Sequence, residues 1–424
     1  MKAAFLFDTF LIQENNNYYG MTLTYEFFKE RYLKYYDEIL VSTRSKKINS
    51  ENGNITGYKI TNGDKVTVKP IKSYNNILDG IIKRKKIKEE ITKILDECDI
   101  AIIRLPSMIG NLACEVCKKI NKKYIVEMVA CAWDGYVNHH NKFGKVIAPY
   151  MFLETRKKVK NAPTVLYVTE KFLQQRYPTK GKGYSCSDVI IEKPDNMILE
   201  KRLQHIENND KIIKLGTVAN VGLKYKGQEF VIKALYTLKK QGKNNYRYYL
   251  VGNGDNKYLK NIVKKYRLEN EVIFMGSLKH KEVFDFINNI DIYIQPSLQE
   301  GLPRALIEAM SRACPCIGSN AGGIPELLDQ ENIFNKRDYK KLCNILTRIN
   351  KKDLKNMATN NFFKVKKYSK EVLEKQRNMI YEVWNEKDRH IYERNEIWRS
   401  GAIFFKLSIK NEFRKIWNIF YSIF

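Results

Sequence analysis

The stretch that decides the fold runs from residue 294 to residue 328 and reads "IQPSLQEGLPRALIEAMSRACPCIGSNAGGIPELL". An apolar, strand-like run comes first and is followed by Glu300. A helix is expected from Pro303, because the first helical turn tolerates a residue without an N–H group. A second strand and the pair Gly322 and Gly323 follow. Strand, helix and strand in this order predict one unit of an α/β sheet.

The same pattern recurs on both sides of this stretch. Short apolar runs without polar alternation are typical of parallel sheets that are covered on both faces. After the first strand we expect a loop at 9–20 and a helix from about Met21. The expected strands are residues 3–8, 37–43, 98–105, 123–130 and 164–170, and then 211–218, 246–254, 271–276, 291–297 and 315–320.

The chain has 424 residues, which is too long for one ordinary core. We therefore predict an α/β protein with two Rossmann-like, doubly wound parallel-sheet domains that face each other across a cleft. The polar, weakly patterned segment 192–210 is expected to link them. The predicted parts are a first domain at 1–195, a second at 196–368, a helix at 369–384 and a tail at 385–424. The helix is expected to pack on the first domain through Val372, Leu373, Met379, Ile380 and Val383.

The formal net charge of +28 indicates a polyanionic partner: nucleic acid, an anionic membrane or a phosphorylated substrate. Signatures of zinc fingers, RNA-binding aromatic motifs and helix-turn-helix units are absent, so we expect no nucleic acid. In the tail, apolar residues recur at steps of four and three from Ile409 to Ile423, with basic residues at the margins. Such a helix suits an anionic membrane surface, the protein's own core or a dimer seam.

The sequence shows no signal-peptide pattern, and no apolar run approaches the ~20 residues of a membrane helix. We therefore expect a cytoplasmic protein with reduced thiols, peripheral on the inner face of the membrane through its tail. Cys114 and Cys117 form a lone C-x-x-C on an apolar helix face. We interpret them as buried free thiols rather than as a redox or metal pair.

Two carboxylates mark the deciding stretch. Glu300 precedes a helix whose free N–H groups and positive dipole end suit an anion or a cluster of hydroxyls. Glu308 lies nearly two turns into that helix, where it could accept hydrogen bonds from adjacent hydroxyls, as on a ribose. Either glutamate alone is also consistent with a solvated surface residue.

The two glutamates and the motifs that follow them are more specific together than either glutamate alone. The E-x7-E spacing in "EGLPRALIE", followed by "AM" and "AGGIPEL", closely resembles family 4 of the retaining glycosyltransferases. The resemblance extends to "KYKGQEFVIKAL", "LVGNG" and "FMGSL", and covers about residues 212–383. The N-terminal half resembles the family in architecture. Its stretches "VACAWDGYVNHH" and "YVTEKFLQQRYP" are similar to bacterial capsule or lipopolysaccharide glycosyltransferases.

The resemblance implies a GT-B fold and a metal-independent, retaining hexosyltransferase. The donor would be a UDP- or GDP-sugar, and the acceptor a saccharide, lipid-linked as cell-surface polysaccharide assembly requires. No cofactor or metal beyond this donor is implied, and the sequence contains no Asp-x-Asp triplet. The alternatives from other classes are a nucleotide-sugar epimerase of the same fold and a basic nucleic-acid-binding protein.

The resemblance also assigns roles. Glu300 would contact hydroxyls of the transferred sugar, and Glu308 would bind the ribose. Lys226 would meet the diphosphate and stabilise charge on the leaving group. The family often has an arginine shortly before its Lys-Gly pair, whereas this chain has none, so Asn220 or Lys224 would substitute. The remaining donor-binding residues implied are Leu278 against the base and Gly301, Leu302 and Arg304 at the helix start.

In the first half, Asp134, His139 and His140 follow the expected strand 123–130, where parallel strands place ligand-binding residues. Asp134 or His139 could position or deprotonate an acceptor hydroxyl, although adjacent histidines are as often surface residues. Gly20 opens the expected helix after the first strand. It is either a close-approach site for a phosphate or acceptor, or an ordinary loop glycine.

Overall fold

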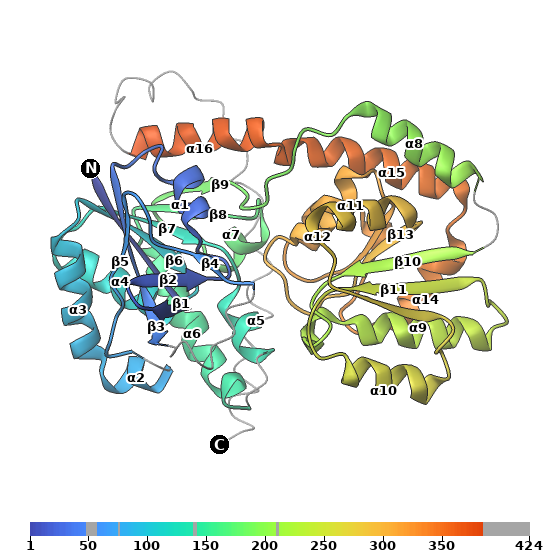
Figure 1. Cartoon of the computed structure of the whole chain (residues 1–424), viewed down its shortest axis with the longest axis horizontal. Coiled ribbons are helices and arrows are strands. Elements are labelled where there is room, and N and C mark those ends of the chain that lie inside the picture. Colours follow the sequence, from blue (N-terminus) through green and yellow to red (C-terminus); the bar gives the residue numbers. More distant parts are fainter. Residues whose placement is uncertain (48–56, 75–76, 139–141, 209–211, 385–424) are drawn as a thin grey trace. The chain divides into compact units, whose positions relative to one another are not determined.

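The computed structural model describes residues 1–47, 57–74, 77–138, 142–208 and 212–384 (Figure 1). Residues 1–377 form one unit that contains two β-sheets. The predicted helix of the tail at 385–424 lies outside the described residues.

The first sheet has nine strands in the order β4-β2-β1-β6-β7-β8-β9, with β3 joining β1 to β5. All neighbours are parallel except β1 with β2 and β2 with β4. The strands are β1 (Lys2–Glu14), β2 (Asn17–Gly20), β3 (Glu38–Lys47), β4 (Lys59–Ile60), β5 (Val66–Val68), β6 (Ile100–Leu105), β7 (Tyr124–Met128), β8 (Thr164–Tyr167) and β9 (Lys182–Ser185). The helices among them are α1 (Tyr25–Arg31), α2 (Ile77–Ile82), α3 (Arg84–Asp96), α4 (Met108–Lys119), α5 (Ala132–Val137), α6 (Lys142–Lys160) and α7 (Phe172–Arg176).

The prediction of a loop at 9–20 is wrong. Strand β1 continues to Glu14, and Asn15, in the left-handed region at φ 53°, turns the chain into β2. The next helix starts at Tyr25 and not at Met21, because the Oγ1 of Thr24 accepts the Phe27 N–H at 3.2 Å and caps it.

The second sheet has six parallel strands in the order β12-β11-β10-β13-β14-β15. They are β10 (Ile213–Val218), β11 (Tyr246–Val251), β12 (Val272–Gly276), β13 (Ile292–Gln295), β14 (Cys316–Ser319) and β15 (Ile333–Phe334). The helices are η1 (Lys224–Lys226), α9 (Gln228–Lys240), α10 (Lys257–Tyr266), α11 (His280–Asn289), α12 (Arg304–Ser311), α13 (Ile324–Leu327), η2 (Gln330–Asn332), α14 (Tyr339–Arg348), α15 (Lys351–Val365) and η3 (Lys366–Tyr368). Figure 1 shows α9 and α10 on one face of this sheet, and α11 and α15 on the other.

Each sheet has its own hydrophobic core. Leu6, Ile103 and Val126 belong to the first, and Leu215 and Ile294 to the second. Apolar strand residues are buried against helices on both faces, which is the arrangement that continuous apolar runs require. The prediction of two α/β parallel-sheet domains is confirmed.

The segment expected to be a linker is a helix, α8 (Asn196–Asn208). Its buried residues are Ile206 and, unusually, Arg202, which is only 3% exposed. The guanidinium of Arg202 donates to the backbone carbonyls of Ile290 at 2.6 Å and Ile287 at 2.7 Å. This segment therefore docks on α11 through an arginine, and a polar sequence becomes an ordered helix.

Helix α16 (Lys370–Trp384) follows η3. Within its first two turns Glu374 pairs with Lys34 at 2.6 Å, and Arg377 donates to the Ser187 carbonyl at 2.9 Å. Leu373 is buried as expected. Val372, assigned to the same apolar stripe, is instead 36% exposed.

No helix in the described part of the chain is long and apolar enough to cross a membrane. The eight cysteines are buried and unpaired. Burial raises the pKa of Cys117 to about 12 and that of Cys114 well above its usual value, so neither thiol of the C-x-x-C is poised for redox or metal chemistry.

Candidate functional site

The candidate site lies where the strand order of the second sheet reverses. From β10 the chain proceeds outward through β11 and β12, then returns to pair β13 with the other edge of β10. Ligands of open α/β sheets bind beyond the carboxyl ends of the strands at such a switch point. The residues that follow β10 and β13 include Asn220, Lys226 and Glu300.

Glu300 and Lys226 meet directly, although 74 residues separate them in sequence. The Lys226 Nζ lies 2.7 Å from the Glu300 Oε1. The hydroxyl of Ser297 donates to the same oxygen at 2.7 Å, and the amide of Gln295 at 3.1 Å. In the part of the chain that the structure describes, no donor reaches Oε2. That oxygen is therefore available for the hydroxyls of a ligand.

The turn before α9 holds Lys226 in place. It ends at Gly227, whose φ of 74° lies in the left-handed region. A Cβ there would lie 2.0 Å from the carbonyl oxygen of Pro296. Only glycine lets this turn approach the loop after β13 so closely, and this approach brings the ammonium to Glu300.

Glu308 is 8% exposed and lies in α12. Its Oε1 is 3.3 Å from the Nε2 of His280, the first residue of α11. The imidazole is 72% exposed, so one side of the pair faces solvent. Leu278 is half-buried two residues before His280, in the turn after β12. The predicted ribose and base residues thus converge on the start of α11.

The Gly-Gly turn shapes the backbone around Glu300. A Cβ on Gly322, at φ 57°, would lie 2.0 Å from the Glu300 carbonyl oxygen. The Gly323 N–H donates to the carbonyl of Gly301 at 2.7 Å. The two loops after β13 and β14 therefore pack backbone to backbone, which explains why glycines stand in this stretch.

Asn220 and Lys224, the expected substitutes for the missing arginine, are engaged elsewhere. The Asn220 Oδ1 accepts the Gly222 N–H at 2.9 Å, and its amide donates to Asn253 at 2.9 Å. The Lys224 ammonium lies over the Tyr258 ring, 4.5 Å from its centroid. Neither makes a contact with Lys226 or Glu300 within the described residues. Their phosphate-binding role stays a prediction.

Asp134 is 6% exposed and lies at the start of α5, just after β7. Its carboxylate is 3.5 Å from the Arg176 guanidinium and 4.0 Å from the Lys336 ammonium. Burial opposes the charge of Arg176, but Cys131 and Asp134 nearby raise its pKa overall. His139 and His140 lie outside the described residues, so their role stays a prediction.

Gly20 ends β2 and does not open a helix. A Cβ there would meet the Leu23 carbonyl at 2.8 Å and the Leu11 side chain at 2.9 Å. This close packing favours a glycine here, and the role of Gly20 in ligand binding stays a prediction.

Known proteins match this chain along most of its length. Residues 196–361 match the family model of glycosyl transferases group 1. Protein CapJ of Staphylococcus aureus is 35% identical over 349 residues, which are 82% of this chain and 86% of that protein. The chain belongs to the group 1 glycosyltransferases.

Two further comparisons bear on this glycosyltransferase. A putative colanic acid biosynthesis glycosyltransferase, WcaL of Escherichia coli K12, is 33% identical over 113 residues, 25% of this chain and 28% of that protein. The structure of Anabaena Alr3699/HepE in complex with UDP superposes with a TM-score of 0.60 at 16% identity, covering 91% of this chain and all of that chain. The fold is the GT-B arrangement of glycosyltransferases.

Sequence reasoning missed several residues of the glycosyltransferase site. Ser297 and Gln295 orient the Glu300 carboxylate, and His280 contacts Glu308. The position of Ser297 and Gln295 at the end of the strand preceding Glu300 was an available signal. His280 stands immediately after the turn assigned to the base, so its position could also have suggested it.

A pocket of about 270 Å³ lies next to Leu302 and Arg304, which follow Glu300 in the chain. It brings Leu302 and Arg304 to residues at the carboxyl ends of β6 to β9. The side chains that line it are Arg104, Val129, Val168, Asp188, Val189, Leu302 and Arg304. Arg104 and Asp188 form an ion pair in it, and Arg304 is exposed.

Proposed function

We propose that this glycosyltransferase moves a hexose, with retention of anomeric configuration, from a UDP- or GDP-sugar to a hydroxyl of a lipid-linked saccharide. The observation that carries the proposal is the 2.7 Å contact of Lys226 with Glu300 at the switch point of the second sheet. It places one fixed cation beside one carboxylate, as transfer from a sugar diphosphate needs.

In this proposal the bond between the anomeric carbon and the diphosphate oxygen breaks as the acceptor oxygen bonds to that carbon. The diphosphate keeps the electron pair, so negative charge grows beside Lys226, whose ammonium is already in position. The Oε2 of Glu300 holds hydroxyls of the sugar, and Glu308 holds those of the ribose. Asp134 positions or deprotonates the acceptor hydroxyl.

Charge neutralisation without a metal ion is part of the proposal. Lys226 lies two residues before the first residue of α9, a helix of 13 residues whose N-terminal N–H groups and dipole also favour a diphosphate. In this proposal the ammonium of Lys226 and the start of α9 supply the positive charge that faces the diphosphate.

The relatives support the choice of substrates. A protein of the same fold was solved with UDP, and WcaL is named for colanic acid biosynthesis, which is a polysaccharide pathway. We propose a nucleotide-sugar donor and a role in cell-surface polysaccharide assembly. The pocket lined by Arg104 and Arg304 is proposed to bind the acceptor.

A panel of UDP-, GDP- and ADP-sugars tests the donor. A ligand at 100 times its Kd stabilises the native state by about 2.7 kcal/mol, which a thermal shift readily shows. One nucleotide series should raise the Tm of the wild-type protein, and it should raise that of Glu308→Ala by clearly less. If none of the series raises it, the donor assignment is wrong.

The product tests the reaction. With a lipid-linked saccharide from a polysaccharide-producing bacterium, the coupling constant of the new anomeric proton should match that of the donor. Inversion would contradict the retaining mechanism. Turnover of the nucleotide sugar to an isomer without any acceptor would instead indicate an epimerase.

A cytoplasmic location at the inner membrane face is proposed from the sequence of the tail. Full-length protein should co-sediment with anionic vesicles at low salt, whereas a form ending near Arg399 should not. Equal behaviour of the two forms would contradict a role of the tail in membrane attachment.

A further inference from the structure

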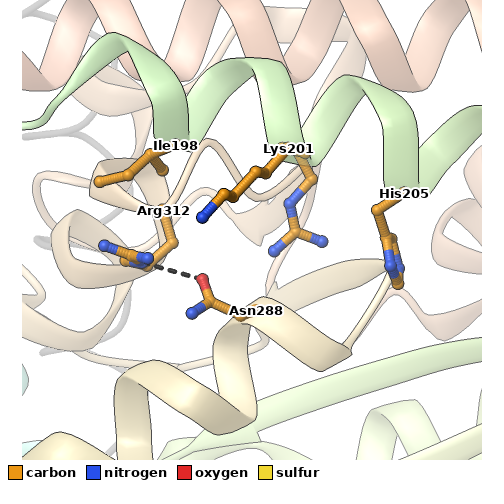
Figure 2. Close-up of a pocket in the computed structure, with 6 residues that line it drawn as sticks. Ile198, Lys201, His205, Asn288 and Arg312 are labelled. Carbon is orange, nitrogen blue, oxygen red and sulfur yellow. Dashed lines mark hydrogen bonds between the residues drawn. The ribbon is translucent and has the colours of Figure 1, made fainter.

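A second hollow, of about 200 Å³, lies between α8 and the ends of α11 and α12 (Figure 2). It is lined by Ile198, Lys201, Arg202, His205, Asn288 and Arg312. None of these residues belongs to the candidate active site. Since a water molecule occupies about 30 Å³ in the liquid, the hollow has room for roughly six.

Two of the basic residues that line the hollow, Arg202 and His205, contact other parts of the domain. Arg202 donates to the carbonyls of Ile287 and Ile290 at the end of α11. His205 lies 2.8 Å from Asp291, a carboxylate that is 4% exposed. These contacts hold α8 on the domain, and they account for both side chains without a ligand.

The other two cations, Lys201 and Arg312, do not have such partners for all their donors in the described stretches of the chain. Lys201 is exposed, and Figure 2 shows it reaching from α8 toward Asn288 and Arg312. Arg312 uses its Nε to donate to the Asn288 Oδ1 at 2.8 Å. Across the described ranges, neither the Lys201 ammonium nor the terminal nitrogens of Arg312 have an acceptor or a carboxylate within bonding distance.

The formal charges around the hollow nearly cancel. Lys201, Arg202 and Arg312 contribute three cations, and the buried Asp291 and the nearby Asp285 contribute two carboxylates. The carboxyl ends of α11 and α12 each add about half a negative charge, so an anion would be held by direct hydrogen bonds from Lys201 and Arg312 and not by a net positive field. Burial and the nearby Arg202 lower the pKa of Arg312, against the attraction of Asp285. An anion bound here would relieve that repulsion.

We propose that this hollow is a binding site for a phosphate group. The Lys201 ammonium and the terminal nitrogens of Arg312 are hydrogen-bond donors on two sides of the hollow, and neither has an acceptor among the described residues. A planar guanidinium can donate to two phosphate oxygens at the same time. The phosphate belongs either to a small phosphorylated solute or to an anionic lipid headgroup, since both present the same chemistry.

The hollow lies at the opposite end of α11 from His280. Helix α11 begins at His280 and reaches Asn288 near its end, and α12 carries Glu308 one turn before Arg312. The same two helices thus join the hollow to the residues proposed to bind the ribose. At 1.5 Å per residue, the phosphate would lie on the order of 12 Å along α11 from His280.

The test measures the binding of inorganic phosphate to the full chain by calorimetry. Lys201→Ala combined with Arg312→Gln should weaken phosphate binding about tenfold or more, because charge-assisted hydrogen bonds are lost from two sides. Lys243→Ala is the matched control, since Lys243 is an exposed lysine of the same domain, and its affinity should equal that of the wild type.

The candidate active site could also take phosphate, so Lys226→Ala is measured alongside. Binding that survives Lys226→Ala and is lost in the double variant supports the hollow. Binding that is lost in Lys226→Ala and kept in the double variant overturns the proposal, as does equal weakening in Lys243→Ala. If the double variant fails to fold, Lys201→Ala alone should still weaken binding, and unchanged affinity would overturn the proposal.

Vesicles of phosphatidylcholine, with and without phosphatidic acid, identify the source of the phosphate. The double variant retains the tail of the wild type, so a difference between them reports on the hollow. Weaker co-sedimentation of the double variant with phosphatidic acid vesicles, and displacement of the wild type by free phosphate, assign a lipid headgroup. Equal co-sedimentation with lost phosphate binding assigns a small phosphorylated solute.

Discussion

Replacing Lys226 by alanine removes the cation that lies 2.7 Å from Glu300. At a separation of 4 Å and an effective dielectric constant near 20, one pair of unit charges is worth about 4 kcal/mol. Charge that develops on a departing diphosphate would lose this interaction. Because 1.36 kcal/mol corresponds to tenfold in rate, we expect kcat to fall by roughly 10² to 10³.

The same change should have a modest effect on folding. Lys226 and Glu300 are 21% and 10% exposed, so their contact is a partly buried, charge-assisted hydrogen bond. Glu300 keeps the donors of Ser297 and Gln295 after the change. We expect the free energy of unfolding to fall by about 1 to 2 kcal/mol, measured by urea denaturation.

Lys233→Ala is the matched control. Lys233 also pairs with a glutamate, Glu229, at 3.1 Å, and the two side chains are 29% and 18% exposed. It lies on α9, past the turn that carries Lys226, so its loss should cost a few tenths of a kcal/mol and leave kcat unchanged. If the Lys226→Ala and Lys233→Ala variants had the same kcat, the role of Lys226 at the diphosphate would be refuted.

Three further predictions follow from particular contacts. Glu308→Ala should weaken binding of the free nucleoside diphosphate in calorimetry about tenfold, and an unchanged Kd would contradict the ribose assignment. Gly227→Ala should destabilise the protein by at least about 2 kcal/mol more than Gly242→Ala, which shares the positive φ but has no atom within 4 Å of its Cβ; equal Tm values would contradict the close approach to Pro296. Burial opposes the charge of Glu115, but Lys158 and Lys88 lower its pKa overall. Because Glu115 is partly exposed and solvent screens its ion pairs, Glu115→Gln should cost roughly 1 kcal/mol or less of stability near pH 7, and the difference should be lost as the pH falls from the ordinary glutamate pKa of 4.5 through the lowered pKa of the folded state.

The sequence predicted the second sheet well because its strands are short, apolar and separated by amphipathic helices. It failed where tertiary contacts override composition. Helix α8 was missed because the residue that anchors it is Arg202, whose burial depends on carbonyls of α11 more than 80 residues away. The extension of β1 was missed because the polar residues Asp8, Thr9, Gln13 and Glu14 interrupt the apolar run after Leu6, and Leu11 is the one residue of this extension that is fully buried.

For the candidate site, the resemblance suggested which residues matter, and the structure shows how they meet. Glu300, Lys226 and Glu308 were predicted from their motifs. Which residues orient them could not be predicted, because Ser297 and His280 act through hydrogen bonds with no local sequence signature. Asn220 was chosen by proximity in sequence, whereas its side chain stabilises its own loop.

The backbone contact of Gly322 and Gly323 with residues 300 and 301 has a consequence for protein engineering. The contact is made between backbone atoms, so substitutions that change only side chains at the rim of the candidate site leave it in place. Libraries that aim to change the accepted donor should keep these glycines fixed. They should vary exposed side chains outside this loop, such as His280, whose side chain is 72% exposed.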